Sequence, residues 1–258
     1  MEFVVLAKQV PDLAEELAVD PAGTDIDREW LTWVASEWDE YALEEALHLR
    51  DAVGGRVTCL AADTGSVDEL LATCLARGAD RAIKVGSFER PPTTHTAARA
   101  FAAALDTIPH DLVLTGVQAI DDLDGQLAPL LAGLRDLPHV SVVTHIAIGT
   151  DGRTATVNQE YAGGIVAEFS VDLPAVLGVQ ASREAPRYAP VSRVRQMMRE
   201  PMESIEAPAE RDGGLIVESL AVPEAGGTAE MIGGSPDQVA ERIAAILAER
   251  GIGKVAVS

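Results

Sequence analysis

Short apolar runs alternate with segments of helical periodicity through the first 149 residues, and this alternation restricts the fold more than any other feature. The runs are rich in Val, Ile and Leu, and they read EFVVLAK, RVTCLAA, RAIKVG, DLVLTG and HVSVVTHIAIG. Helices are predicted in the intervals, at residues 36–53, 66–78, 94–108 and 127–134. Strands and helices that alternate in this way indicate right-handed βαβ units. We therefore predict an α/β fold with a parallel sheet covered by helices on both faces.

The helix at residues 36–53 carries signals at both ends. Ser36 stands three residues before Asp39, which is the spacing of a capping box, and Gly54 follows the last apolar position. Residues 14–35, which precede this helix, contain the turn cluster DPAGTD and are expected to be irregular. The pair Glu44–Glu45 is predicted to lie on the solvated face of the same helix.

The sequence changes in character after Gly149. Residues 154–180 hold β-rich runs interrupted by Gly163–Gly164 and Pro174, which favours antiparallel strands at the edge of the sheet. Residues 185–227 are rich in Pro, Gly and Glu with little periodicity, apart from SRVRQMMR, and are expected to form a loop and an extended arm.

The last predicted element is an amphipathic helix, SPDQVAERIAAILAERG, with Ser235 as its cap and Gly251 as its stop. An isolated helix of this length is marginally stable in water, so it is expected to dock on a protein surface. We divide the chain into an α/β domain at 1–184, a loop and arm at 185–234, and this helix at 235–258.

The charge balance excludes some partners. The 258 residues include 41 acidic and 20 basic side chains, a net charge of −21, so neither nucleic acid nor an anionic membrane is an expected partner. No apolar stretch approaches the roughly 20 residues of a membrane span, and a cytoplasmic location is expected. The two cysteines, Cys59 and Cys74, are expected to be buried core thiols, and the scattered histidines do not suggest a metal site.

Common catalytic motifs are missing from the sequence. It contains neither the Walker A pattern nor the nucleophile elbow, and no glycine follows the first strand where a dinucleotide fingerprint would place one. We therefore expect no catalytic residues.

The segment DLVLTGVQAIDDLDGQLAP is the best candidate for a ligand site. Ligands of open parallel sheets bind at the carboxyl ends of the strands, and Gly116 stands at such an end, where a ligand could approach the backbone. The N–H groups from Gly125 to Leu127 begin a helix and could bind an anion. One or two of Asp121, Asp122 and Asp124 could cap this helix or accept from ribose hydroxyls while only backbone faces a phosphate. Alternatively, all three only cap and solvate the loop.

Several segments together resemble one protein family. They are VVLAKQVPD, DEYALEEALHLRD, ARGADRAIKV, DLVLTGVQAIDDLDGQLAP and DLPAVLGVQASREAPRYAPVSRVRQMM, followed by a C-terminal helix. In this order they are similar to the beta subunit of electron transfer flavoproteins, over nearly the whole chain.

The resemblance implies a Rossmann-like domain in a heterodimer with an alpha subunit, which holds most of a redox-active FAD. It also implies that electrons pass from acyl-CoA or other dehydrogenases to a quinone oxidoreductase. The final helix would dock on the alpha subunit, and the loop Val10, Pro11 and Leu13 would face the flavin. Val191 stands where the family has a leucine that contacts client dehydrogenases.

The resemblance further implies that the chain binds an adenine nucleotide. The implied contacts are Leu6, Ala7, Ser36, Asp39, Ala62, Gly116, Gln118, Ala119, Ile120, Asp121, Asp122, Gly125, Gln126 and Leu127. Asp122 would fix the loop or bind ribose, and Gly125 and Gln126 would supply donors at the helix start.

The identity of the nucleotide depends on a few positions. Ordinary members bind AMP and have a Thr that bonds its phosphate, whereas this chain has Leu127 there. Electron-bifurcating members, which bind a second FAD instead of AMP, have an apolar residue and then a proline, as Leu127 and Pro129 do here, but a glycine where this chain has Asp122. AMP is the first expectation and a second FAD the alternative. A nucleotide-binding sensor without redox function is a further alternative.

Overall fold

A computed structural model describes residues 1–122, 125–208, 214, 216–223, 229 and 231–252. The chain separates into two compact units, Met1–Ser219 and Leu220–Ser258. The boundary expected at residue 184 stays a prediction. Among the described residues, no helix has the length and apolar character needed to cross a membrane.

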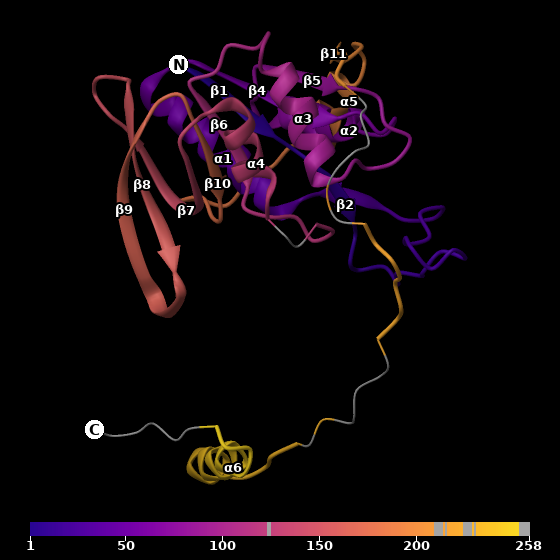
Figure 1. The fold of residues 1–258 in the computed structure, drawn as a ribbon, viewed down its shortest axis with the longest axis vertical. Helices are drawn as coiled ribbons and strands as arrows, with labels where there is room; N and C mark the ends of the chain where they lie inside the picture. The colour runs from indigo at the N-terminus through magenta and orange to yellow at the C-terminus, as the bar shows by residue number, and fades with distance from the viewer. Residues whose placement is uncertain (123–124, 209–213, 215, 224–228, 230, 253–258) are drawn as a thin grey trace. The chain divides into compact units, whose positions relative to one another are not determined.

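The first unit is built on a nine-stranded sheet with the order β11-β5-β4-β1-β6-β10-β7-β8-β9 (Figure 1). Its strands are β1 Glu2–Leu6, β4 Arg56–Ala62, β5 Arg81–Val85, β6 Leu112–Gly116, β7 His139–Ile148, β8 Thr154–Tyr161, β9 Ile165–Asp172, β10 Ala175–Val179 and β11 Glu203–Ile205. The pairs from β11 to β7 are parallel, and β7–β8 and β8–β9 are antiparallel. The predicted α/β class is confirmed.

Helices cover both faces of the sheet, as the sequence predicts. They are α1 Glu37–Val53, α2 Asp68–Arg77, α3 Thr94–Ala104 and α4 Leu127–Arg135. One core cluster joins α1 and α2 to Phe3 and Val5 of β1, and the other joins α3 and α4 to Val4 and Leu6. Alternate side chains of a strand point to opposite faces, so β1 anchors both layers. Cys59 and Cys74 are free, buried thiols, as expected.

The placement of β10 differs from the prediction. Residues 154–180 were expected to be antiparallel edge strands, and β8 and β9 are, with the 3₁₀ turn Ala162–Gly164 between them. β10, however, pairs in parallel with both β6 and β7, and all five of its residues are buried. A strand covered on both faces is a continuous apolar run, which AVLGV is.

Residues 14–35 are not wholly irregular. Trp33–Ala35 forms β3, which pairs antiparallel with β2, Gln9–Pro11, in a separate two-stranded sheet. β2 follows β1 directly, so the chain leaves the main sheet after Leu6 and returns to α1 through β3 (Figure 1).

Two expectations for α1 are wrong. Ser36 occupies the N-cap position but makes no side-chain cap bond, and the Asp39 carboxylate bonds to the ends of β1 and β6 and not back to Ser36, so the box is not formed. Glu44 and Glu45 are 2% and 1% exposed and are not solvated. Both face the segment that follows β10, where Arg187 Nε donates to Glu44 Oε1 over 2.9 Å and Arg183 Nη2 lies 3.4 Å from Glu45 Oε1.

The segment after residue 185 contains regular structure in its first part. α5, Val191–Met197, buries Val194 against Ala72 and Ala76 of α2, and β11 extends the sheet beside β5. This part of the expected arm is therefore packed on the α/β unit.

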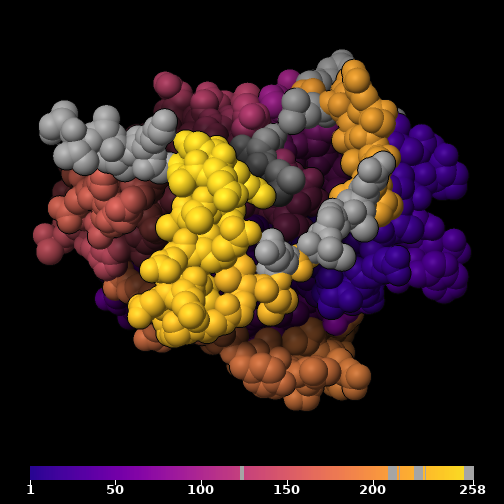
Figure 2. Space-filling view, turned by 90° about the horizontal axis from the view of Figure 1, so that it is seen from below, coloured from indigo at the N-terminus to yellow at the C-terminus, as the bar shows by residue number. Residues whose placement is uncertain are grey.

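The second unit contains α6, Pro236–Glu249, drawn in yellow in Figure 2. Ser235 and Gln238 form a full capping box, and Pro236 begins the helix, as expected. Gly251 has a φ of 72° and ends it, since its N–H and that of Ile252 bond to carbonyls of the last turn. None of the residues of α6 is buried.

Candidate functional site: a pocket at the carboxyl ends of the strands

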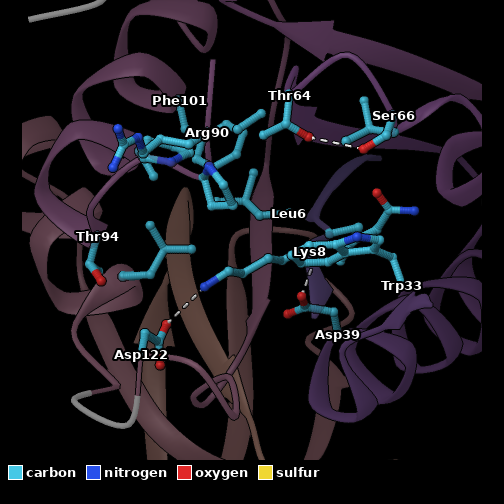
Figure 3. A pocket seen from close by; sticks show the side chains of 18 of the residues that line it. Leu6, Lys8, Trp33, Asp39, Thr64, Ser66, Arg90, Thr94, Phe101 and Asp122 are labelled. Atoms are coloured by element: carbon cyan, nitrogen blue, oxygen red, sulfur yellow. Dashed lines mark hydrogen bonds and ion pairs between the residues drawn. The ribbon is translucent and has the colours of Figure 1, made fainter. Parts of the chain in front are cut away.

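A cavity of about 210 Å³ lies at the carboxyl ends of β1 and β4, beside the starts of α3 and α4 (Figure 3). This is the place where open parallel sheets bind ligands. Its lining residues are Leu6, Ala7, Lys8, Gln9, Arg28, Trp33, Asp39, Ala62, Thr64, Ser66, Val67, Glu89, Arg90, Pro91, Pro92, Thr94, Ala97, Phe101, Asp122 and Leu127.

Lys8 projects from the end of β1 across this pocket toward the loop after β6 (Figure 3). Its Nζ lies 2.6 Å from Asp121 Oδ1 and 3.9 Å from Asp122 Oδ2. The predicted contacts omit Lys8, and its pairing with the acidic loop was not foreseen, because the two are 113 positions apart in the sequence. The available signal was its position at a strand end, which faces the same edge of the sheet as the loop.

Asp39 joins the ends of two strands from the first turn of α1. One of its oxygens accepts from the Lys8 N–H over 2.9 Å, and the other accepts from the Gly116 N–H over 2.8 Å. Burial raises the pKa of Asp39 to about 7, although these two donors and the Lys8 charge act in the opposite direction. The nearby Asp122 carboxylate also favours the protonated form.

Both glycines of the candidate loop are required by the chain's own packing. A Cβ on Gly116 would lie 2.6 Å from Asp39 Oδ1 and 2.7 Å from Trp38 Cβ, so this position lets α1 approach the end of β6. Gly125 has a φ of 58°, and a Cβ there would lie 2.9 Å from the Val117 carbonyl oxygen. The group that closely approaches the backbone at Gly116 is thus α1, whereas the sequence analysis expected a ligand there.

The described acidic residues of the loop have partners within the chain. Asp122 Oδ1 accepts from the Ala119 N–H over 2.9 Å, which closes a turn and fits the predicted loop-fixing role. Asp121 is paired with Lys8. Asp124 lies outside the described residues. α4 then begins at Leu127, with Gln126 at its N-cap position and no side-chain cap bond.

The opposite wall of the pocket is cationic and aromatic, and it was also missed. The Arg28 guanidinium lies 5.3 Å from the centroid of the Trp33 ring, and its Nη2 is 2.9 Å from Asp25 Oδ1. Arg90 lies in the loop before α3, Thr94 is the first residue of that helix, and Phe101 lies further along it (Figure 3). Arg28 and Trp33 belong to a stretch without periodicity, so no pattern marked them.

The expected nucleotide contacts divide into three groups in the structure. Leu6, Ala7, Asp39, Ala62, Asp122 and Leu127 line the pocket. Ser36 and Ile120 line a second hollow of about 170 Å³, together with Val10, Pro11 and Leu13. The remainder lie on the strand end and loop beside the pocket, outside its described lining: Gly116, Gln118, Ala119, Asp121, Gly125 and Gln126.

Val191, the expected contact for client proteins, is the first residue of α5 and is 58% exposed. Neighbouring Tyr188 is 79% exposed. Within the part of the chain that the structure describes, no group of His, Cys, Asp or Glu side chains could hold a metal ion.

Comparison with known proteins assigns the chain to a family. The model for the electron transfer flavoprotein domain matches residues 25–210. The electron transfer flavoprotein subunit beta of Methylophilus methylotrophus is 28% identical, over 96% of this chain and 98% of its own length. The mitochondrial subunit beta of Oryza sativa subsp. indica is 32% identical over 85% and 94%, and Protein FixA of Azorhizobium caulinodans is 34% identical over 64% and 61%. The chain belongs to the electron transfer flavoprotein family and resembles its beta subunits over most of its length.

Proposed function

We propose that the chain is the beta subunit of a heterodimeric electron transfer flavoprotein and that its pocket binds AMP as a structural ligand. Electrons enter from acyl-CoA or other dehydrogenases and leave to a quinone oxidoreductase. FAD, held mainly by the alpha subunit, supplies the redox chemistry, and this chain contributes no catalytic residue. The observation that carries the proposal is the pocket at the carboxyl ends of β1 and β4, beside the start of α4.

The lining of the pocket fits an adenine nucleotide. Leu6, Ala7, Ala62 and Val67 offer apolar surface for a base. The start of α4, where the N-cap residue Gln126 makes no side-chain cap bond, presents backbone donors and the positive end of a helix dipole to a phosphate. The walls and the helix start together supply the two kinds of contact that such a ligand requires.

A second FAD in place of AMP is the alternative, and two observations favour it. Leu127 lines the pocket where a phosphate-bonding Thr is common in the family, so a side-chain donor is missing. The pocket also extends to Trp33, Arg28 and Arg90, where a larger ligand would find an aromatic ring and positive charge. This wall has no evident use for AMP alone.

Three surfaces are assigned to the partners. The hollow lined by Val10, Pro11 and Leu13 faces the flavin held by the alpha subunit. α6, which buries none of its residues in this chain, docks on the alpha subunit through an apolar face that includes Ile243 and Leu247, 46% and 41% exposed. Val191 contacts client dehydrogenases.

Identification of the nucleotides released from the denatured, purified heterodimer tests the proposal. We expect AMP and one FAD per heterodimer, measured by chromatography against standards. Two FADs without AMP would select the alternative ligand. A chain that proved a monomer or homodimer with one freely exchanging nucleotide and no flavin would contradict the redox role and favour a sensor.

A further inference from the structure

We propose that Lys8 binds the phosphate of the nucleotide and is held in place for this by Asp121 and Asp122 of the acidic loop. The inference rests on the proposed nucleotide site and assigns its phosphate-binding cation. It names a residue that neither the loop motif nor the helix start includes.

The acidic loop presents an electrostatic problem for a phosphate ligand. Asp121 and Asp122 stand between the end of β6 and the start of α4, and a phosphate at that helix start would meet two like charges. Lys8 Nζ lies 2.6 Å from one of these carboxylates and 3.9 Å from the other. Its charge therefore compensates the loop at the point where an anion would enter.

Hydrogen bonds hold both the backbone and the side chain of Lys8. Its backbone N–H donates to Asp39, a side chain that is buried and also bonded to the end of β6. Its ammonium group is oriented by Asp121, yet the side chain lines the pocket and remains 31% exposed. A lysine ammonium has three N–H donors, so one can bond to Asp121 while another faces a ligand.

The other cations of the pocket are less suited to this role. Arg28 is engaged by Asp25 through both Nε and Nη2 and lies over Trp33. Arg90 stands at the α3 side, on the wall opposite the loop. Among the described residues of the pocket, Lys8 is the cation that pairs with the loop leading into α4.

The chain offers a matched control in Lys84. Its Nζ is also shared by two carboxylates, 3.4 Å from Asp63 and 3.4 Å from Asp68, and its side chain is 22% exposed. It stands on β5, a neighbour of β4, but does not belong to the described lining of the pocket. Replacing it removes the same charge and a similar pair of contacts without touching the proposed ligand.

Calorimetric titration of the full-length chain with AMP and with adenosine provides the test. Lys8→Gln should weaken AMP binding by roughly 10- to 100-fold, the effect of one charge-assisted hydrogen bond, and leave adenosine binding within about twofold. Lys84→Gln should change neither. Loss of AMP and adenosine affinity in equal measure would show that Lys8 only shapes the loop, and unchanged AMP affinity would also overturn the inference.

The outcome for the unmodified chain separates this inference from the proposed function. If it binds neither AMP nor adenosine, the nucleotide site itself is contradicted, and the inference falls with it. If it binds both with equal affinity, the site stands and the phosphate contact is refuted. Binding of AMP more tightly than adenosine, lost only in Lys8→Gln, supports both.

Discussion

Asp39 illustrates how one side chain can hold the pocket together. It was expected to touch the nucleotide and to complete the cap of α1, but its two oxygens accept from the backbone at the ends of β1 and β6. These strands are neighbours in the sheet, so Asp39 fixes both of them to the start of α1. It lines the pocket as well, which makes its protonation state a property of the site.

The raised pKa of Asp39 predicts a specific pH dependence of stability. The pKa is about 7 in the folded chain against a reference value of 3.8, because burial disfavours the charged form. Between these values the folded chain binds more protons than the unfolded chain. This contribution to the free energy of unfolding therefore falls as pH rises from about 4 to about 7, by at most about 1.4 kcal/mol per pH unit, and is constant above.

Chemical denaturation at pH 5, 6, 7 and 8 measures this effect when the unmodified chain is compared with Asp39→Asn. The variant cannot ionise, so its stability should fall less between pH 5 and 7, while the other titrating groups contribute equally to both proteins. Parallel pH profiles for the two proteins would mean that Asp39 titrates normally.

Single residues of the site were predictable only in part. Leu6, Ala7 and Ala62 could be placed because each ends or directly follows an apolar run that had to finish at one edge of the sheet. Lys8 and Trp33 could not, since their roles depend on partners distant in sequence or on a stretch without periodicity. Gly116 was identified as a close approach, but the approaching group is α1 and had to be seen in three dimensions.

Among the elements, α1 has a polar face that was wrongly predicted to be exposed to solvent. Its apolar spacing correctly predicted a helix, and two adjacent glutamates normally indicate a solvated face. Glu44 and Glu45 are instead covered by the segment after β10, whose Arg187 and Arg183 supply the compensating charge. Burial of this pair depends on residues about 140 positions further on, which local periodicity does not encode.

Loss of Arg187 should destabilise the first unit strongly. Its backbone N–H and its Nε both donate to Glu44, whose side chain is 3% exposed. Arg187→Ala leaves that carboxylate buried with one donor fewer, so we expect the free energy of unfolding to fall by roughly 2–4 kcal/mol.

Arg56→Ala is the control for that measurement. Arg56 pairs with Glu2 at 2.8 Å but is 68% exposed, so its loss should cost less than about 1 kcal/mol. Urea denaturation of both variants compares the two pairs, and an equal small loss in each would contradict the burial argument.

β10 is the element whose position was least predictable. Its five residues form the continuous apolar run of a strand buried on both faces, but two antiparallel strands precede it in the same β-rich stretch. Only the sheet order reveals that the chain returns to the interior between β6 and β7. The α/β class was nevertheless predictable, because it depends on the alternation of the five predicted strands, which are β1, β4, β5, β6 and β7, with the four helices α1 to α4.

At the scale of the whole molecule, two features carry exposed apolar side chains. α6 buries none of its residues, and the hollow beside Leu13 and Ile120 is open. The net charge of −21 further disfavours association with anionic surfaces. Membership of the electron transfer flavoprotein family and these exposed apolar surfaces both point to a protein partner, which we propose is the alpha subunit.

Co-expression with that alpha subunit, followed by the visible absorbance of the purified complex, tests the account most directly. We predict a stable yellow heterodimer with bound FAD, while the chain purified alone should fail to retain flavin tightly. A stable but colourless complex of the two chains would contradict the proposed role in electron transfer.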